Sequence, residues 1–272
     1  MNRLLLSKKP IKKNIIKNKQ NINKNQDNIS NFMEEDLIKK SYITYINLED
    51  RIDRRQKFES FYKNETFEPK RFNAIKTSKD NFTKKYPHLE LSSYLNDLRN
   101  IKWINGTLGC YDSHYSILLD NLNNTEQDFL VVLEDDCTIS TKSLNKCLNY
   151  LNNNKNIDIL RINCWKDIPE NPFKINFTNP HSKYVNNQSI YYDGGTHCCI
   201  FLIKNIPKVI SYMNNEYVYQ IDAIYSTNKI NSVIYKIDEE IKYKSVSSIQ
   251  KQGLDLKDKK DKILFQKLLL RK

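Results

Sequence analysis

The stretch 129–136, FLVVLEDD, joins five apolar residues directly to three carboxylates. A short apolar run that includes β-branched residues is typical of a strand buried on both faces of a sheet. Three adjacent carboxylates repel one another, and such crowding raises their pKa values unless a cation relieves it. The sequence therefore predicts a buried strand whose carboxyl end, at Glu134, Asp135 and Asp136, attracts positive charge.

Strands and helices are predicted to alternate on both sides of this stretch. Apolar runs predict strands at 42–46, 71–75, 129–133, 157–162, 189–192, 198–203 and 233–237. Helical spacing predicts helices at 53–62, with Asp53 as N-cap, from about 107 with a core stripe that includes Leu119, and at 142–151, 206–213 and 219–227. This alternation indicates a single α/β domain with a mostly parallel central sheet covered on both faces. Ligands of such sheets bind beyond the carboxyl ends of the strands, which is where 134–136 would lie.

The formal net charge of +12 resides at the two ends of the 272-residue chain. Residues 1–40 carry a net charge of +6 and residues 251–272 carry +5, which leaves about +1 for residues 41–250. We expect a disordered basic tail over 1–40 and a basic amphipathic helix within 251–272. The nearly neutral body argues against a specific nucleic-acid-binding protein, although the basic ends could contact an anionic membrane surface or an acidic partner.

The sequence contains no apolar run near the roughly 20 residues that span a bilayer. Leu4, Leu5 and Leu6 are too few for the apolar region of a secretory signal. The six cysteines form no CxxC pair, so scattered free thiols in a reducing compartment are expected. The interpretation is a cytoplasmic protein, with peripheral membrane contact through the basic ends as an open alternative.

The acidic cluster has the chemistry of a metal site. In an extended chain alternate side chains share a face, so Glu134 and Asp136 should point one way and Asp135 the other. Carboxylate oxygens suit Mg²⁺ or Mn²⁺, whose remaining positions can take water and phosphate oxygens. A solvated turn at the end of the strand is the alternative.

Three further segments contain residues that could bind phosphate, a metal ion or another ligand. The segment 47–55, NLEDRIDRR, offers arginines that can pair with phosphates, or it is an ordinary solvated helix start. In 109–114, GCYDSH, Cys110 and His114 share a helical face as metal ligands do, but no second pair completes a zinc site. In 194–197, GGTH, the paired glycines permit either a close backbone approach to a ligand or a hairpin turn.

The order of these segments resembles glycosyltransferase family 25, the group of bacterial lipooligosaccharide galactosyltransferases and collagen galactosyltransferase domains. The resemblance covers residues 41–250. The matching pieces are Tyr45-Ile46-Asn47-Leu48 with Arg51 and Asp53-Arg54-Arg55; Arg71-Phe72-Asn73-Ala74; Gly109-Cys110 with Ser113-His114; Leu133-Glu134-Asp135-Asp136; Gly195-Thr196-His197; and, more weakly, Ile221-Asp222.

The resemblance implies a Rossmann-like fold of the GT-A type, in which a UDP-sugar donates a hexose, galactose or glucose, to a hydroxyl of a glycan or protein with inversion. It implies Mn²⁺ or Mg²⁺ as cofactor, with Glu134 and Asp136 as metal ligands. The implied nucleotide-sugar-binding residues are Asn47, Arg51, Arg54, Arg55, Glu134 and Asp135. Asp222 and His197 are the candidate bases, and the implied supporting residues are Cys110, Ser113, His114, Gly195 and Thr196.

Two departures from the family pattern concern the acceptor. Cys198 and Cys199 stand where small and aromatic residues are commoner, and Ala223 follows Asp222 where the family favours Trp. Acceptor identity is therefore the least defined part of the resemblance. A catalytically inactive relative that serves as a binding module is the alternative, although an idle site has no reason to keep three mutually repelling carboxylates.

Overall fold

The computed structural model describes residues 37–92, 95–96, 101–163, 170–174, 184–185, 188–189, 195–239 and 241. The predictions for the N-terminal tail up to residue 36, for the C-terminal helix and for Gly194 lie outside the described residues. So does most of the strand predicted at 189–192.

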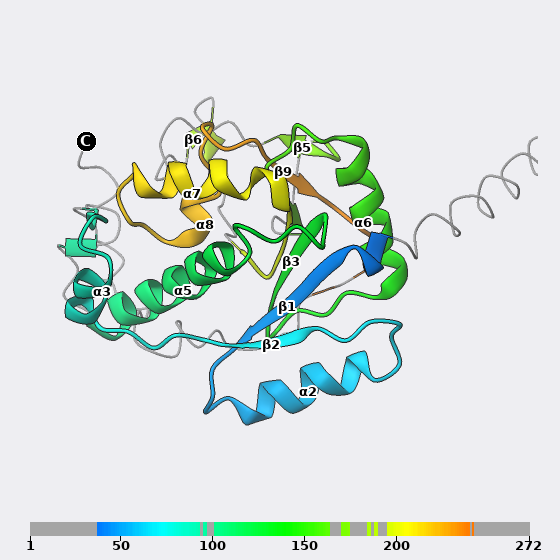
Figure 1. The fold of residues 1–272 in the computed structure, drawn as a ribbon, viewed down its shortest axis with the longest axis horizontal. Coiled ribbons are helices and arrows are strands. Elements are labelled where there is room, and N and C mark those ends of the chain that lie inside the picture. The colour runs from blue at the N-terminus through cyan, green and yellow to red at the C-terminus, as the bar shows by residue number, and fades with distance from the viewer. Residues whose placement is uncertain are drawn as a thin grey trace, which may run out of the picture.

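A seven-stranded sheet runs through the centre of the molecule (Figure 1). Its strands, in spatial order, are β2 (Lys70–Asn73), β1 (Ser41–Asn47), β3 (Phe129–Glu134), β8 (Cys198–Leu202), β4 (Ile159–Ile162), β9 (Ser232–Tyr235) and β5 (Phe173–Lys174). The short strands β6 (Tyr184–Val185) and β7 (Gln188–Ser189) form a separate antiparallel pair.

The sheet is mixed, whereas the sequence predicted a mostly parallel one. Strand β1 pairs in parallel with β2 and β3, and β4 pairs in parallel with β9. Strand β8 is antiparallel to both of its neighbours, β3 and β4, and β5 is antiparallel to β9. The difference arises because β8 inserts between β3 and β4, a long-range pairing that its apolar sequence does not reveal.

The helices are α2 (Ile52–Tyr62), α3 (Lys79–Lys85), α5 (Ile101–Asp120), α6 (Thr141–Asn153), the 3₁₀ turn η1 (Ile203–Asn205), α7 (Ile206–Asn214) and α8 (Ile221–Ile224). Helix α5 begins about a turn and a half earlier than predicted. Its stripe residues Tyr111, Tyr115 and Leu118 are buried as expected, but Leu119 is exposed. Asp53 does not cap α2: the N-cap position is Arg51, and Asp53 lies in the first turn.

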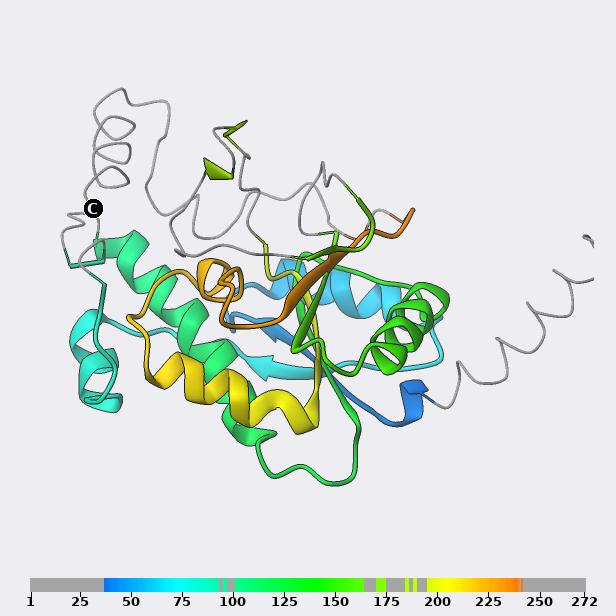
Figure 2. The same ribbon diagram turned by 90° about the horizontal axis from the view of Figure 1, so that it is seen from above.

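Alternation along the central strands divides the core into two layers. Leu130 and Val132 of β3 pack on the face covered by α3, α5, α7 and α8, where α5 and α7 run side by side (Figures 1 and 2). Val131 and Leu133 pack on the opposite face with residues of α2 and α6. This burial on both faces explains why β3 reads as a continuous apolar run rather than an alternating one.

Adjacent cysteines of β8 show the same division. Cys198 belongs to the layer of α2 and α6, while Cys199 belongs to the layer of α5 and α7. All five described cysteines are free thiols. Among the described helices, none is long and apolar enough to cross a membrane.

The carboxyl ends of β1, β2 and β3 meet at one edge of the sheet, because the three strands are parallel. From β1 the chain passes through α2 to β2 on one side, and after α5 it returns to β3 on the other side. In open α/β sheets this arrangement leaves a crevice where the connections diverge. The acidic residues that follow β3 lie at this edge, as the sequence predicted.

Candidate functional site

A cavity of about 420 Å³ opens at the carboxyl edge of β1, β2 and β3. Four segments line it: Ile46 and Leu48 around the end of β1, residues 74–78 after β2, one face of α5, and residues 134–136 at the end of β3. Arg54 of α2 completes the wall. The cavity therefore combines the three acidic side chains with one buried cation.

Arg54 pairs with the two aspartates of the acidic segment. Its Nη1 donates to Asp135 Oδ1 at 2.6 Å and lies 3.7 Å from Asp136 Oδ2. All three side chains are at most 10% exposed. The predicted alternation of these carboxylates is wrong, because β3 ends at Glu134 and residues 135–136 form a turn that directs both aspartates to Arg54.

Asn47 holds the other oxygen of Asp135. Its Nδ2 donates to Asp135 Oδ2 at 2.8 Å, and its own Oδ1 accepts from Nε of Arg71. Burial raises the pKa of Asp135 above its ordinary value, and the hydrogen bonds from Arg54 and Asn47 offset part of this effect. Asn47 therefore orients the carboxylate and lies behind it, outside the cavity lining.

The other two arginines predicted on the nucleotide side point elsewhere. Arg51 grips Asp53 with two hydrogen bonds, from Nε at 3.0 Å and from Nη2 at 2.9 Å. Arg55 does not line the cavity. Of the predicted arginines, only Arg54 lines the cavity.

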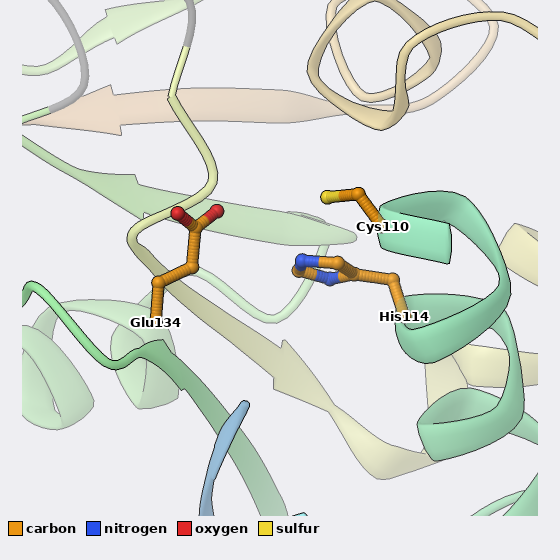
Figure 3. Close-up of side chains that lie close together, drawn as sticks. All are labelled: Cys110, His114 and Glu134. Carbon is orange, nitrogen blue, oxygen red and sulfur yellow. The ribbon is translucent and has the colours of Figure 1, made fainter. Parts of the chain in front are cut away.

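Glu134 lies across from Cys110 and His114 of α5 (Figure 3). Its carboxylate points toward the Cys110 thiol and the His114 ring, and one possible ligand atom from each of these residues lies within 4.8 Å of the others. Thr196 Oγ1 donates to Glu134 Oε1 at 2.6 Å and holds the carboxylate in place. The strand explains this direction, because Glu134 continues the face of Leu130 and Val132.

Both α5 residues of this cluster are held in their neutral forms. Burial, reinforced by the charges of Glu134 and Asp222, raises the pKa of the Cys110 thiol well above its usual range. Burial and the charge of Arg161 lower the pKa of His114 to about 3. The pair is therefore not the thiolate–imidazolium pair of a cysteine nucleophile.

Asp222, one of the two predicted bases, lies on α8 beside the same cluster. Burial raises its pKa, and the Arg161 charge offsets part of the effect. Its Oδ1 accepts from the amide of Ala223 at 2.9 Å. His197, the other predicted base, is buried with its ring against Gly195: a Cβ on Gly195 would stand 2.5 Å from Nδ1 of His197. Neither base lines the cavity.

Arg161 connects the segment of Gly195 and His197 to the segment of Asp222 and Ser226. The sequence patterns did not predict this role. Its guanidinium is buried, donates to the carbonyl of Gly195 at 2.8 Å and to Oγ of Ser226 at 2.6 Å, and approaches the carbonyl of Asp222 at 3.4 Å. A charged residue inside the apolar run ILRI was the available signal, because a strand rarely buries an arginine without fixed partners.

The GCYDSH segment holds α5 against the loop after β2. A Cβ on Gly109 would stand 2.5 Å from the carbonyl oxygen of Ile75, so only glycine permits this approach. Ser113 Oγ accepts from the Ile75 amide at 2.9 Å and donates to the Gly109 carbonyl. Ser113 thus joins α5 to the loop that lines the cavity. Lys76 in this loop, paired with Asp50 at the surface, is a further cavity residue that the sequence argument missed.

Comparison with protein families identifies a family for this chain. The model described as glycosyltransferase family 25 (LPS biosynthesis protein) matches residues 38–221, which is more than half of the chain and includes the whole cavity lining. The chain belongs to glycosyltransferase family 25. Membership supports a glycosyltransferase role with a sugar donor and a glycan acceptor. A search of curated proteins found no match.

In this family 25 member, the three carboxylates of residues 134–136 are not neutralised equally. Carboxylates at this position have the oxygen chemistry that Mn²⁺ and Mg²⁺ prefer. Arg54 already neutralises part of the charge of Asp135 and Asp136, whereas Glu134 is turned toward a sulfur and a nitrogen donor. Glu134 is therefore the carboxylate of the segment that stands apart from the arginine.

Proposed function

We propose that this family 25 member transfers a hexose, galactose or glucose, from a UDP-sugar to a hydroxyl group of a glycan or protein. One observation carries the proposal: Arg54 and the acidic segment meet at a cavity on the carboxyl edge of the sheet, inside the region that matches the family. We also propose that the mixed sheet is of the GT-A type, in which the acidic segment following a central strand receives the donor.

The cavity contains two positively charged side chains that a diphosphate could contact. Arg54 lies in its wall, and Lys76 carries a second positive charge at its exposed rim. Arginine can bind phosphate oxygens in forked geometry. A divalent cation, Mn²⁺ or Mg²⁺, would supply Lewis acidity, with Glu134 and Asp136 as the protein ligands that the motif chemistry favours. Glu134 now faces Cys110 and His114 and Asp136 faces Arg54, so both carboxylates would have to turn to share one ion.

The proposed reaction is a single displacement with inversion. The oxygen of the acceptor hydroxyl attacks the anomeric carbon, the bond from that carbon to the diphosphate oxygen breaks, and UDP departs. The hydroxyl proton passes to a base on the face opposite the diphosphate. Asp222 is the first candidate, since its raised pKa strengthens it as a proton acceptor, and His197 is the second. Because neither lines the cavity, this role requires a rearrangement that exposes the base to the acceptor.

Donor binding and hydrolysis test this proposal. UDP, with Mn²⁺ present, should raise the melting temperature of the full chain, and the protein should slowly hydrolyse the matching UDP-sugar. Asp136→Asn should reduce hydrolysis at least about a hundredfold, as for loss of a transition-state electrostatic contact, while circular dichroism stays unchanged. The exposed residue Asp53 supplies a control, Asp53→Asn, that should retain activity.

Two outcomes would contradict the proposal in different ways. UDP binding without hydrolysis of any UDP-sugar, in the presence of a glycan extract, would favour a catalytically inactive binding module. Full activity of Asp136→Asn, or activity that is the same with and without metal ions, would remove the metal from the mechanism.

A further inference from the structure

The group formed by Cys110, His114 and Glu134 brings sulfur, nitrogen and oxygen donors together from two elements that are distant in sequence. Cys110 and His114 are four residues apart on α5 and so share one helical face, and Glu134 arrives from the end of β3 (Figure 3). Within the part of the chain that the structure describes, this is the one group of three such side chains close enough to hold a metal ion.

His114 gives an independent indication of a ligand. Its side chain is only 1% exposed, and among the described residues neither ring nitrogen has a hydrogen-bond partner. A buried polar group without a partner costs about 1–3 kcal/mol, so an imidazole is seldom left in this state. Its edge-on contact with the ring of Tyr225, with centroids 5.8 Å apart, does not satisfy either nitrogen.

We infer that Cys110, His114 and Glu134 form a binding site for a divalent cation of borderline softness, with Zn²⁺ as the preferred ion. Zn²⁺ takes thiolate, imidazole and carboxylate ligands at about 2.0–2.3 Å, and tetrahedral ligands at these distances stand about 3.5 Å apart. Cys110 is a neutral thiol without the ion, so binding displaces its proton to solvent. The ligand atoms lie within 4.8 Å of one another, so small side-chain rotations close the site.

The site is accessible and partly prearranged. All three side chains line the cavity, which provides a path for the ion. Thr196 holds the Glu134 carboxylate through Oε1, an arrangement that commonly orients metal-binding carboxylates. Three protein ligands would leave a fourth position open, as in catalytic zinc sites.

The ligand chemistry distinguishes this site from the oxygen-only pair of Glu134 and Asp136. A thiolate disfavours Mg²⁺ and favours Zn²⁺ or Co²⁺. Both sites need Glu134, so Zn²⁺ at Cys110 and His114 withdraws that carboxylate from a harder ion. Zinc binding itself does not depend on the proposed function. The role of the zinc ion does rest on that function: in the proposed transferase, the open coordination position would receive an oxygen of the donor's diphosphate.

Metal binding can be measured directly on the full chain, without any donor. After chelator treatment, the protein should bind one equivalent of Zn²⁺, and Co²⁺ should produce the thiolate-to-cobalt charge-transfer absorption of a sulfur-ligated ion. Cys110→Ser should abolish this absorption, and His114→Gln and Glu134→Gln should each weaken Zn²⁺ binding at least tenfold. Cys147→Ser, a buried thiol of α6 away from the cavity, is the matched control and should change neither signal.

Two further measurements keep the inference falsifiable if a variant fails to fold. Asp136→Asn should retain Zn²⁺ binding, and X-ray absorption of the wild-type protein loaded with Zn²⁺ should show one sulfur among the ligands. A zinc shell of oxygen and nitrogen alone would overturn the inference. So would the absence of stoichiometric binding, in which case ordered water fills the gap beside His114.

Failure of this inference and failure of the proposed function give different results. Loss of zinc binding with retained UDP binding removes the site and leaves the transferase proposal intact. Zinc bound through Cys110 by a protein that never binds UDP removes the transferase proposal and leaves the site.

Discussion

Arg54 and Asp135 lie 81 residues apart in the chain and form a 2.6 Å ion pair that joins α2 to the end of β3. The pair is buried, and Asp136 lies within 3.7 Å of the same nitrogen of Arg54. The crowded carboxylates of the acidic segment are thus partly neutralised by the chain itself. The proposed metal ion would balance only the remainder.

Arg54→Met should destabilise the protein by about 3–5 kcal/mol, because it leaves buried carboxylates without their cation. Urea unfolding followed by circular dichroism measures this change. Arg51→Met is the matched control: Arg51 starts the same helix but pairs with the exposed Asp53, so its loss should cost less than about 1 kcal/mol. Equal effects of the two substitutions would show that the Arg54 pair contributes nothing special to stability.

Asp222→Asn should stabilise the protein at neutral pH while removing the proposed base. The pKa of Asp222 is raised above 3.8, so the folded state binds more protons than the unfolded state as pH rises above this value. The wild type therefore loses stability over that range, and the advantage of Asp222→Asn should grow with pH and then level off.

Asp53→Asn is a control for that experiment, because the contribution of Asp53 to stability should change with pH in the opposite direction. Its hydrogen bond from Arg51 lowers the pKa of Asp53 to about 2, so its contribution to stability is present above its ordinary pKa and is lost as pH falls. Denaturant unfolding of both variants between pH 3 and 8 measures the two trends. A constant difference between Asp222→Asn and wild type across this range would show that burial does not perturb Asp222.

Gly109→Ala should destabilise the protein by about 1–3 kcal/mol, because the added Cβ would stand 2.5 Å from the backbone oxygen of Ile75. The loop after β2 would have to move away from α5 and would widen the cavity. Urea unfolding and UDP titration measure the two effects. Lys102→Ala, at an exposed position of α5, should stay within about 0.5 kcal/mol of wild type.

Arg161→Met should destabilise the protein by about 3–5 kcal/mol, because the carbonyl of Gly195 and the hydroxyl of Ser226 lose a buried charged donor. It should also raise the pKa of Asp222 further, since the charge of Arg161 now lowers it. Arg161→Lys should recover only part of the stability, because a single ammonium cannot reproduce the forked contacts. A lysine variant as stable as wild type would show that charge alone suffices.

Residue type and spacing correctly predicted the strands and helices that depend mainly on neighbouring residues. The first strand, the first helix and the acidic strand were placed to within a residue or so at their ends, since β-branched runs and helical spacing are local signals. The carboxyl edge of the sheet was predicted as the site because the alternation of strands and helices implies parallel neighbours. The position of β8 could not be read from its sequence, because strand order depends on contacts between distant segments.

In the candidate site, too, local features could be predicted from the sequence and features that depend on distant contacts could not. The segment 47–55 indicated arginines near the acidic residues, but successive helical residues point about 100° apart, so the sequence could not tell Arg54 from Arg55. The pairing of Cys110 and His114 was visible from their spacing, whereas the third donor required the direction of Glu134. Glu134 shares the face of Leu130 and Val132, but which helix covers that face depends on contacts between distant segments.

Cys198 and Cys199 enter different layers of the core although they are neighbours in the chain. Their side chains diverge across the pleat, so each thiol can be chemically modified only when its own side of the sheet opens. In single-cysteine variants, the alkylation rates of these two sulfurs would separately time the local opening of each helical cover. The two thiols of β8 would thus report independently which face of the sheet opens first.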